Sequence, residues 1–117
     1  MGHMQMGFAA FLNGAQTAVL QGVDLFAEQA QRFLAASEFA AKLQLNVTSA
    51  NSGLLCSGQG VKLTMMPTFE VAHANFVRLG LSDVYTQQQL TANVRPHANQ
   101  IGSQVSIWET LSHGLPI

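Results

Sequence analysis

Glu70 and His73 have the spacing in this sequence that comes closest to a chemical site. A Glu-x-x-His pair on a helix puts a carboxylate and an imidazole on one side, one turn apart, which is half of the ligand pattern of di-iron carboxylate bundles. The chain contains this pair once, so a complete site would need a symmetric dimer. An acid in the first turn of a helix has a simpler explanation, because the helix dipole favours it there. We therefore predict no metal and no other cofactor.

Cys56 is the single cysteine, so no disulfide can form within the chain. A thiol becomes a nucleophile when a histidine activates it, and His73 and His97 are the candidate partners. No flanking sequence signature supports such a pair, and a lone cysteine in a short apolar run is more often a small buried residue. We therefore predict no catalytic residue. One cysteine is compatible with a reducing compartment, so we expect a cytoplasmic location.

Residues 68–79 and 83–95 have the outline of a helix–turn–helix DNA-binding motif, with Gly80 in the turn. The second helix carries amide and hydroxyl groups that can bind base edges, and glutamine is suited to adenine. Phe76 argues against the motif, because it occupies the position four before the glycine, where the two helices need a small residue. This alternative has as its DNA-contact candidates Tyr85, Gln87, Gln88, Asn93 and Arg95.

A second alternative is a binder of small apolar ligands, or an unrecognised enzyme, with a cleft lined by methionine and phenylalanine. Such clefts form where different elements meet, and methionine adapts to irregular ligands. The same side chains can equally well form the core, and we favour the core. The ligand-pocket candidates are Met65, Phe69, His73 and Phe76.

Charged residues are scarce, at 9% of 117 residues, against about 25% in a typical soluble protein. Five Lys and Arg balance six Asp and Glu, which disfavours nucleic acid or anionic lipid held mainly by charge. The sequence has no apolar uncharged run of the roughly 18 residues that span a membrane, so we expect no membrane association. A hydrophobic share of 48% disfavours disorder.

Met1–Met4 resembles a cloning remnant, so we expect residues 1–5 to precede a single domain of residues 6–117. From residue 7 to 42, apolar residues recur at helical spacing along one stripe. Gly22, followed by Asp24, is the expected break, which leaves either one bent helix or two helices at about 7–21 and 23–42. The near-heptad spacing suits pairing with another helix.

The period changes after Lys42, where Leu43, Leu45 and Val47 alternate with polar residues as in a half-buried strand. Runs at 54–56, 61–65 and 104–111 are the further expected strands. The two helices at 68–79 and 83–95, the second capped by Ser82, stand between them. We therefore predict an α+β fold in the order α(α)βββααβ, with a small antiparallel sheet of about 3–4 strands and helices packed on one face.

Our leading functional hypothesis is a small non-enzymatic protein-binding module. A surface so poor in charge repels other molecules weakly, and the long N-terminal stripe is apolar enough to pair with a second helix. We expect self-association through the N-terminal helices into a dimer or higher oligomer, with another protein as a further candidate partner. The protein-interface candidates are Phe8, Leu12, Val19, Phe26 and, on the last predicted strand, Trp108.

Overall fold

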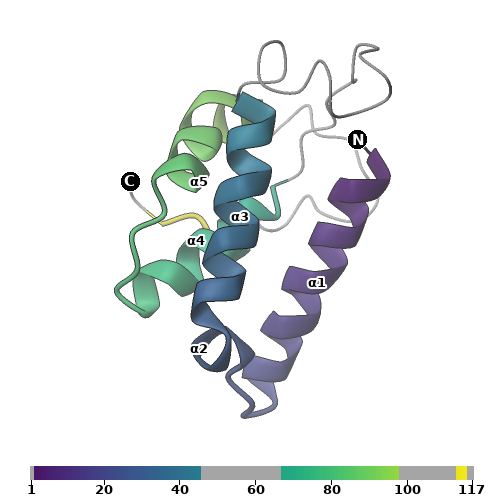
Figure 1. Cartoon of the computed structure of the whole chain (residues 1–117), viewed down its shortest axis with the longest axis vertical. Helices are drawn as coiled ribbons and strands as arrows, with labels where there is room; N and C mark the ends of the chain where they lie inside the picture. The colour runs from purple at the N-terminus through teal and green to yellow at the C-terminus, as the bar shows by residue number, and fades with distance from the viewer. Residues whose placement is uncertain (1, 46–66, 98–112, 116–117) are drawn as a thin grey trace.

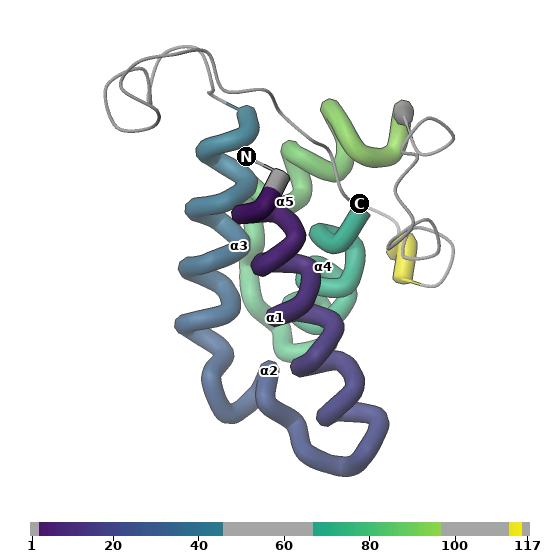
Figure 2. Tube along the Cα trace, turned by 90° about the vertical axis from the view of Figure 1, so that its right-hand side faces the viewer, coloured from purple at the N-terminus to yellow at the C-terminus, as the bar shows by residue number. Residues whose placement is uncertain are grey.

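The structure, a computed structural model, describes residues 2–45, 67–97 and 113–115, and its described elements are helices (Figure 1). Two long helices run in opposite directions side by side, and shorter helices pack against them (Figure 2). The elements are α1 (Gly2–Leu20), α2 (Leu25–Glu28), α3 (Ala30–Leu45), α4 (Phe69–Arg78), α5 (Val84–Gln89), a π-helical stretch (Leu90–Val94) and a 3-10 turn (Arg95–His97).

The predicted α+β fold is wrong, because the described residues form a helical bundle and contain no strand or sheet. The first predicted strand began at Leu43, where α3 in fact continues to Leu45. Leu43 and Gln44 are both buried, so the alternation of apolar and polar residues does not separate two faces. Extending an existing helix needs no new nucleation, and so short an alternation does not outweigh that advantage. The strands predicted at 54–56, 61–65 and 104–111 lie outside the described residues.

The predicted break at Gly22 is confirmed. Gly22 has a φ of +88°, in the left-handed region that glycine tolerates best. The Asp24 carboxylate then caps α2 by accepting a hydrogen bond from the Ala27 N–H at 3.0 Å. The N-terminal region is therefore two helices, α1 and α3, joined by the four-residue α2. α1 begins at Gly2, so the segment expected to be a cloning remnant is the first turn of this helix.

Gly80 ends α4, as its position predicted. Its φ is +67°, its N–H donates to Val77 O at 3.1 Å, and the Leu81 N–H donates to Phe76 O at 2.9 Å. These two bonds form the Schellman arrangement that commonly closes a helix.

The predicted Ser82 cap is wrong by one residue. Asp83 stands at the N-cap position of α5, and its side chain makes no capping bond because it binds His73. The α-helix ends before Pro96, as predicted, but helical backbone continues over the proline as the 3-10 turn.

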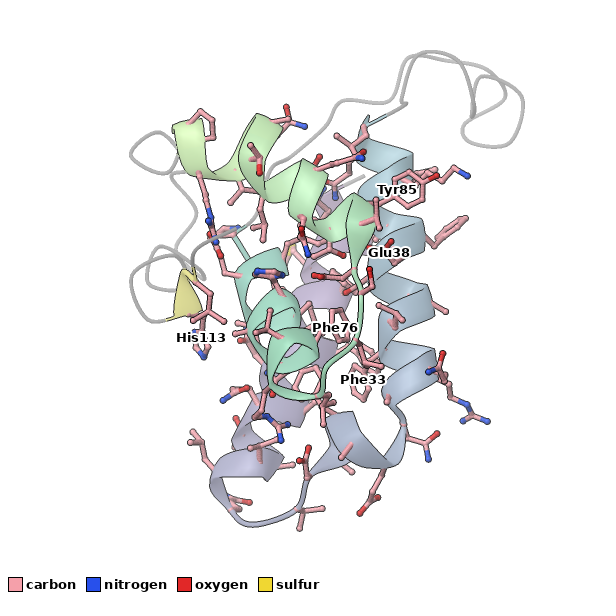
Figure 3. The ribbon with its side chains drawn as sticks, turned by 90° about the vertical axis from the view of Figure 1, so that its left-hand side faces the viewer. Phe33, Glu38, Phe76, Tyr85 and His113 are labelled. Atoms are coloured by element: carbon pink, nitrogen blue, oxygen red, sulfur yellow. The ribbon has the colours of Figure 1, made fainter. Side chains whose placement is uncertain are left out.

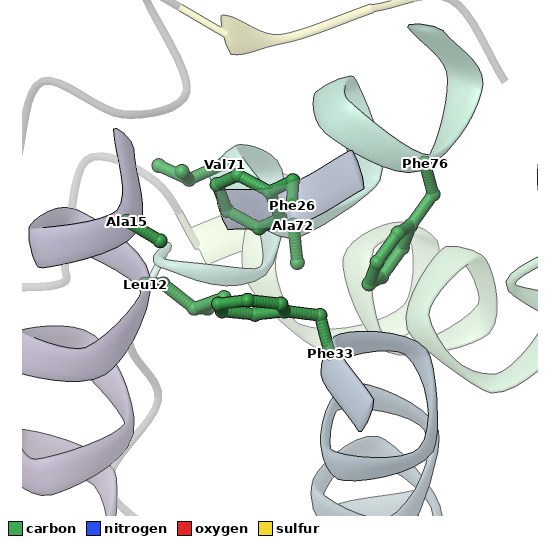
Figure 4. Close-up of a cluster of buried hydrophobic side chains, with 7 residues drawn as sticks. All are labelled: Leu12, Ala15, Phe26, Phe33, Val71, Ala72 and Phe76. Carbon is green, nitrogen blue, oxygen red and sulfur yellow. The ribbon is translucent and has the colours of Figure 1, made fainter. Parts of the chain in front are cut away.

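Two clusters of buried apolar side chains hold the helices together, each large side chain contributing about 1.5–3 kcal/mol. Phe8 on α1 packs against both clusters, and its ring centroid lies 5.4 Å from that of Phe69. The first cluster joins α1, α2, α3 and α4 (Figure 4) and consists of Leu12, Ala15, Phe26, Phe33, Val71, Ala72 and Phe76. The second joins α3, α4 and the segment after α5 and consists of Ala40, Ala41, Phe69, Leu90 and Val94.

None of the helices described has both the length and the apolar character needed to cross a membrane.

Candidate functional site

Glu38 of α3 binds the start of α5 (Figure 3). Its carboxylate accepts hydrogen bonds from the backbone N–H groups of Tyr85 and Thr86, at 3.0 and 2.8 Å, and from the Thr86 hydroxyl at 2.9 Å. A carboxylate at a helix N-terminus satisfies free N–H groups and interacts favourably with the helix dipole. Glu38, a residue of α3, thus caps the N-terminus of α5 in place of Asp83, whose side chain makes no capping bond.

His73 and Asp83 form a buried pair between α4 and the start of α5. The imidazole Nδ1 lies 2.8 Å from Asp83 Oδ2, and the two side chains are 2% and 0% exposed. The Gln87 amide donates to the other oxygen of Asp83 at 3.0 Å. His73 Nε2 is buried and has no hydrogen-bond partner among the described residues.

Ser37 gives this pair the composition of a Ser–His–Asp triad. Its hydroxyl is buried and likewise has no hydrogen-bond partner within the described parts of the chain. In such a triad the carboxylate orients the imidazole, and the imidazole takes the proton of the serine. Here no hydrogen bond joins Ser37 to His73, and the three residues as a whole are each at most 1% exposed. Their side chains are therefore closed off from solvent and belong to the core.

Glu70 and Arg95 form a second ion pair, in which the carboxylate is buried and the Arg95 side chain is 27% exposed. Arg95 donates from Nε and from one terminal nitrogen to the two carboxylate oxygens, each at 2.8 Å, and the same terminal nitrogen donates to Leu115 O at 2.7 Å. The Glu70 carboxylate raises the pKa of Arg95. Glu70 and His73 therefore bind different partners, and the described residues bring together no group of three or more potential metal ligands.

Asp24 and Arg78 form a third ion pair, at the surface. The guanidinium donates to both oxygens of Asp24, at 2.7 and 3.0 Å, and the two side chains are 36% and 43% exposed. The Arg78 hydrogen bond is the main cause that lowers the pKa of Asp24. Arg78 also donates to the side-chain oxygen of Asn75 (Oδ1), and the side-chain amide of Asn75 donates to Gln16 Oε1 of α1 at 2.8 Å.

The DNA-contact candidates lie on α5 and the turns after it, but most are engaged within the chain. Gln87 and Asn93 donate to Asp83 and Gln89, and Tyr85 lies under the Lys42 ammonium at 5.1 Å. Arg95 is the single Lys or Arg between residues 84 and 97, and Glu70 holds it. Gln88 is the candidate that is exposed. Within the described stretch 84–97, no Lys or Arg is therefore left unpaired for phosphate contacts.

Three of the four ligand-pocket candidates lie in the core. Phe69, His73 and Phe76 are 2%, 1% and 0% exposed, and the two phenylalanines are members of the apolar clusters. Met65 lies outside the described residues. A surface hollow of about 300 Å³ lies elsewhere, lined by residues 27–32 at the junction of α2 and α3.

The four protein-interface candidates on α1 and α2 are covered, fully or in part, by the chain itself. Leu12 and Phe26 are fully buried, and Phe8 and Val19 are partly buried against the same cluster. Trp108, like Cys56, lies outside the described residues. The apolar stripe from which we predicted helix pairing therefore packs on α3 and α4.

The exposed surface of α1 carries a feature that the stripe did not predict. Large apolar side chains are exposed along it, with Met6 at 54% and Leu20 at 80%, whereas Phe11, at 47%, stacks on Phe33 of the core with ring centroids 4.4 Å apart. A Cβ built on Gly7 or Gly14 would meet no atom within 4 Å, so nothing in the described chain requires glycine at these positions. We call this surface the outer face of α1, and its exposed residues are His3, Met4, Met6, Gly7, Ala10, Phe11, Gly14, Thr17 and Leu20.

The outer face of α1 has no formal charge, and this could have been read from the sequence. The first Asp, Glu, Lys or Arg of the chain is Asp24, beyond the end of the helix.

Comparison with protein-family models, with curated proteins and with solved structures found no match for the chain.

Proposed function

We propose that the chain is a small non-enzymatic protein-binding module that self-associates through its N-terminal region, with the outer face of α1 as the contact surface. The observation that carries this proposal is an exposed helix face with several large apolar side chains and no charge. A soluble protein surface is typically about 25–35% charged, so an uncharged helix face is suited to being covered by another protein.

Two other kinds of partner fit this face less well. Nucleic acids and anionic lipid surfaces attract clustered cations, and α1 has neither Lys nor Arg. An enzymatic role also has little support, because the Ser37, His73 and Asp83 side chains are closed off from solvent. Protein is the partner class that remains consistent with an apolar, uncharged surface.

Gly14 offers a test that leaves the core intact. Gly14→Glu places a charge on the outer face without a steric clash, because a Cβ there has open space. We expect sedimentation velocity and light scattering at micromolar concentration to show an oligomer for the natural chain and at least about tenfold weaker association for Gly14→Glu. Gly14→Ala is the matched control, which keeps the face uncharged and should retain the association. A monomeric natural chain contradicts the proposal.

A cytoplasmic location belongs to the same proposal and is supported by the single cysteine. Fractionation of cells that make the protein tests it, and recovery in an extracellular or membrane fraction would contradict it.

A further inference from the structure

We infer that Arg95 is a latch that holds two segments of the chain closed, the helical stretch 90–97 and the segment 113–115. When its ion pair with Glu70 breaks, both segments open together, while α1, α3 and α4 stay folded. This conformational device is separate from self-association through α1, so the test of one does not decide the other.

The guanidinium of Arg95 joins three parts of the chain. Its Nε and one terminal nitrogen donate to the two carboxylate oxygens of Glu70 on α4, each at 2.8 Å. The same terminal nitrogen donates to the Leu115 carbonyl at 2.7 Å. Because Glu70 is 0% exposed and binds the guanidinium with both oxygens, it fixes the orientation of the planar group. The donor that holds Leu115 is therefore positioned from the core of the bundle.

The stretch 90–97 has little local support for its conformation. After α5 the chain continues as the π-helical stretch Leu90–Val94, which the Arg95 N–H closes by donating to Leu90 O. Pro96 has no N–H with which to continue an α-helix, and a proline disfavours helical backbone at the residue before it. Arg95 nevertheless has helical backbone, with a φ of −63° and a ψ of −42°. This conformation therefore depends on tertiary contacts, and the Glu70–Arg95 pair is one of them.

The second tertiary contact of this stretch is apolar and would be uncovered by opening. Leu90 and Val94 are fully buried and pack with Phe69 in the second apolar cluster. Phe69 directly precedes Glu70, so the ion pair stands next to this cluster in the chain. The first cluster, which joins α1, α2, α3 and α4, includes neither Leu90 nor Val94. The bundle can therefore stay folded while the end after α5 opens, because folds commonly open in separate cooperative units.

A double substitution breaks the latch without leaving an unpaired charge in the core. Glu70→Met combined with Arg95→Met replaces the ion pair by apolar side chains, a kind of change that is often neutral for stability. We expect the amide of residue 95 to exchange its hydrogen at least about tenfold faster than in the natural chain. The backbone order parameter at Leu115 should fall from about 0.85 to below about 0.6. Exchange at Phe33 and Ala72 should change by less than about twofold.

Arg78→Met is the matched control, because it removes an arginine from the exposed pair with Asp24 and should leave both measurements unchanged. A Leu115 that stays rigid in the double variant, or an unchanged exchange rate at residue 95, would overturn the latch. Loss of helix in circular dichroism, or equally faster exchange at Phe33 and Ala72, would overturn it as well. In that case the ion pair supports the whole bundle, and no separate segment opens.

Discussion

Glu70 has no exposed surface, and the guanidinium of Arg95 is the group that compensates its charge. Removing Arg95 would leave an unpaired carboxylate in the core. We expect Arg95→Ala to lower the free energy of unfolding by about 2–4 kcal/mol, somewhat less than the roughly 3–5 kcal/mol typical of a fully buried pair, because the Arg95 side chain is 27% exposed. Arg78→Ala is the control, because the Asp24–Arg78 pair is exposed to solvent and should contribute much less to stability. Urea unfolding measures both, and equal losses for the two variants would show that Glu70 is hydrated.

Asp24 should make stability depend on acid pH. Its folded-state pKa lies below the ordinary value of 3.8 because Arg78 donates to its carboxylate. A carboxyl with a lowered pKa contributes stability above its unfolded pKa and loses that contribution as the pH falls through its folded pKa. We expect Asp24→Asn to flatten the acid side of a plot of urea midpoint against pH, with Glu28→Gln as the control. An unchanged acid slope would contradict the pairing.

The chemistry of single residues was partly predictable, but their partners were not. The spacing of Glu70 and His73 placed them correctly on one side of a helix. Their partners lie 25 and 10 residues away in the sequence, and a single sequence does not show which distant residues meet. The same is true of Glu38, whose carboxylate binds residues 47 and 48 positions further along the chain.

At the scale of the element, glycines were the most informative residues. Gly22 and Gly80 have positive φ angles, and both were placed at helix ends from residue type alone. The strand predicted from Leu43 failed because a period of two over a few residues also fits the end of a helix with buried neighbours. The stripe on α1 was correctly identified as apolar, but its partner is the chain's own core.

Two glycines of different conformation should respond in opposite ways to alanine. Gly80→Ala should destabilise the fold by about 1–2 kcal/mol, because a side chain disfavours the left-handed backbone, and Gly80 has a φ of +67°. Gly14→Ala should stabilise it by up to about 1 kcal/mol, because alanine is the better residue in a helix interior and a Cβ there has open space. Chemical unfolding of the two variants measures the difference, and a shift in the same direction would contradict the assigned helix end.

Glu38 should control the start of α5 more than the rest of the bundle. Glu38→Ala removes the acceptor for two backbone N–H groups, and we expect a loss of about 0.5–2 kcal/mol, the range for a removed helix cap. Hydrogen exchange should quicken most at the amides of Tyr85 and Thr86. Glu28→Ala, on an exposed position of α2, should leave these amides unchanged. Uniformly faster exchange across α1 and α5 would mean that Glu38 supports the whole fold and does not act as a local cap.

At the scale of the whole molecule, four of the acidic side chains in the described residues bind other parts of the chain. Asp24, Glu38, Glu70 and Asp83 each bind a group on another element or helix end, and α1 carries no charge at all. The low charge content was visible in the sequence and led us to expect self-association. The sequence did not show which surface, because that depends on which side of α1 packs against the core.

Self-association should make the stability of the whole molecule depend on its concentration. A contact between folded chains stabilises the folded state by mass action, and each tenfold rise in concentration is worth up to about 1.4 kcal/mol. We therefore expect the thermal midpoint of the natural chain to rise with protein concentration, and that of Gly14→Glu to stay constant. Gly14→Ala should rise like the natural chain, which separates the loss of association from the change of helix propensity. A midpoint that does not vary with concentration in the natural chain would show that the outer face of α1 stays uncovered, because a folded monomer gains nothing from added copies.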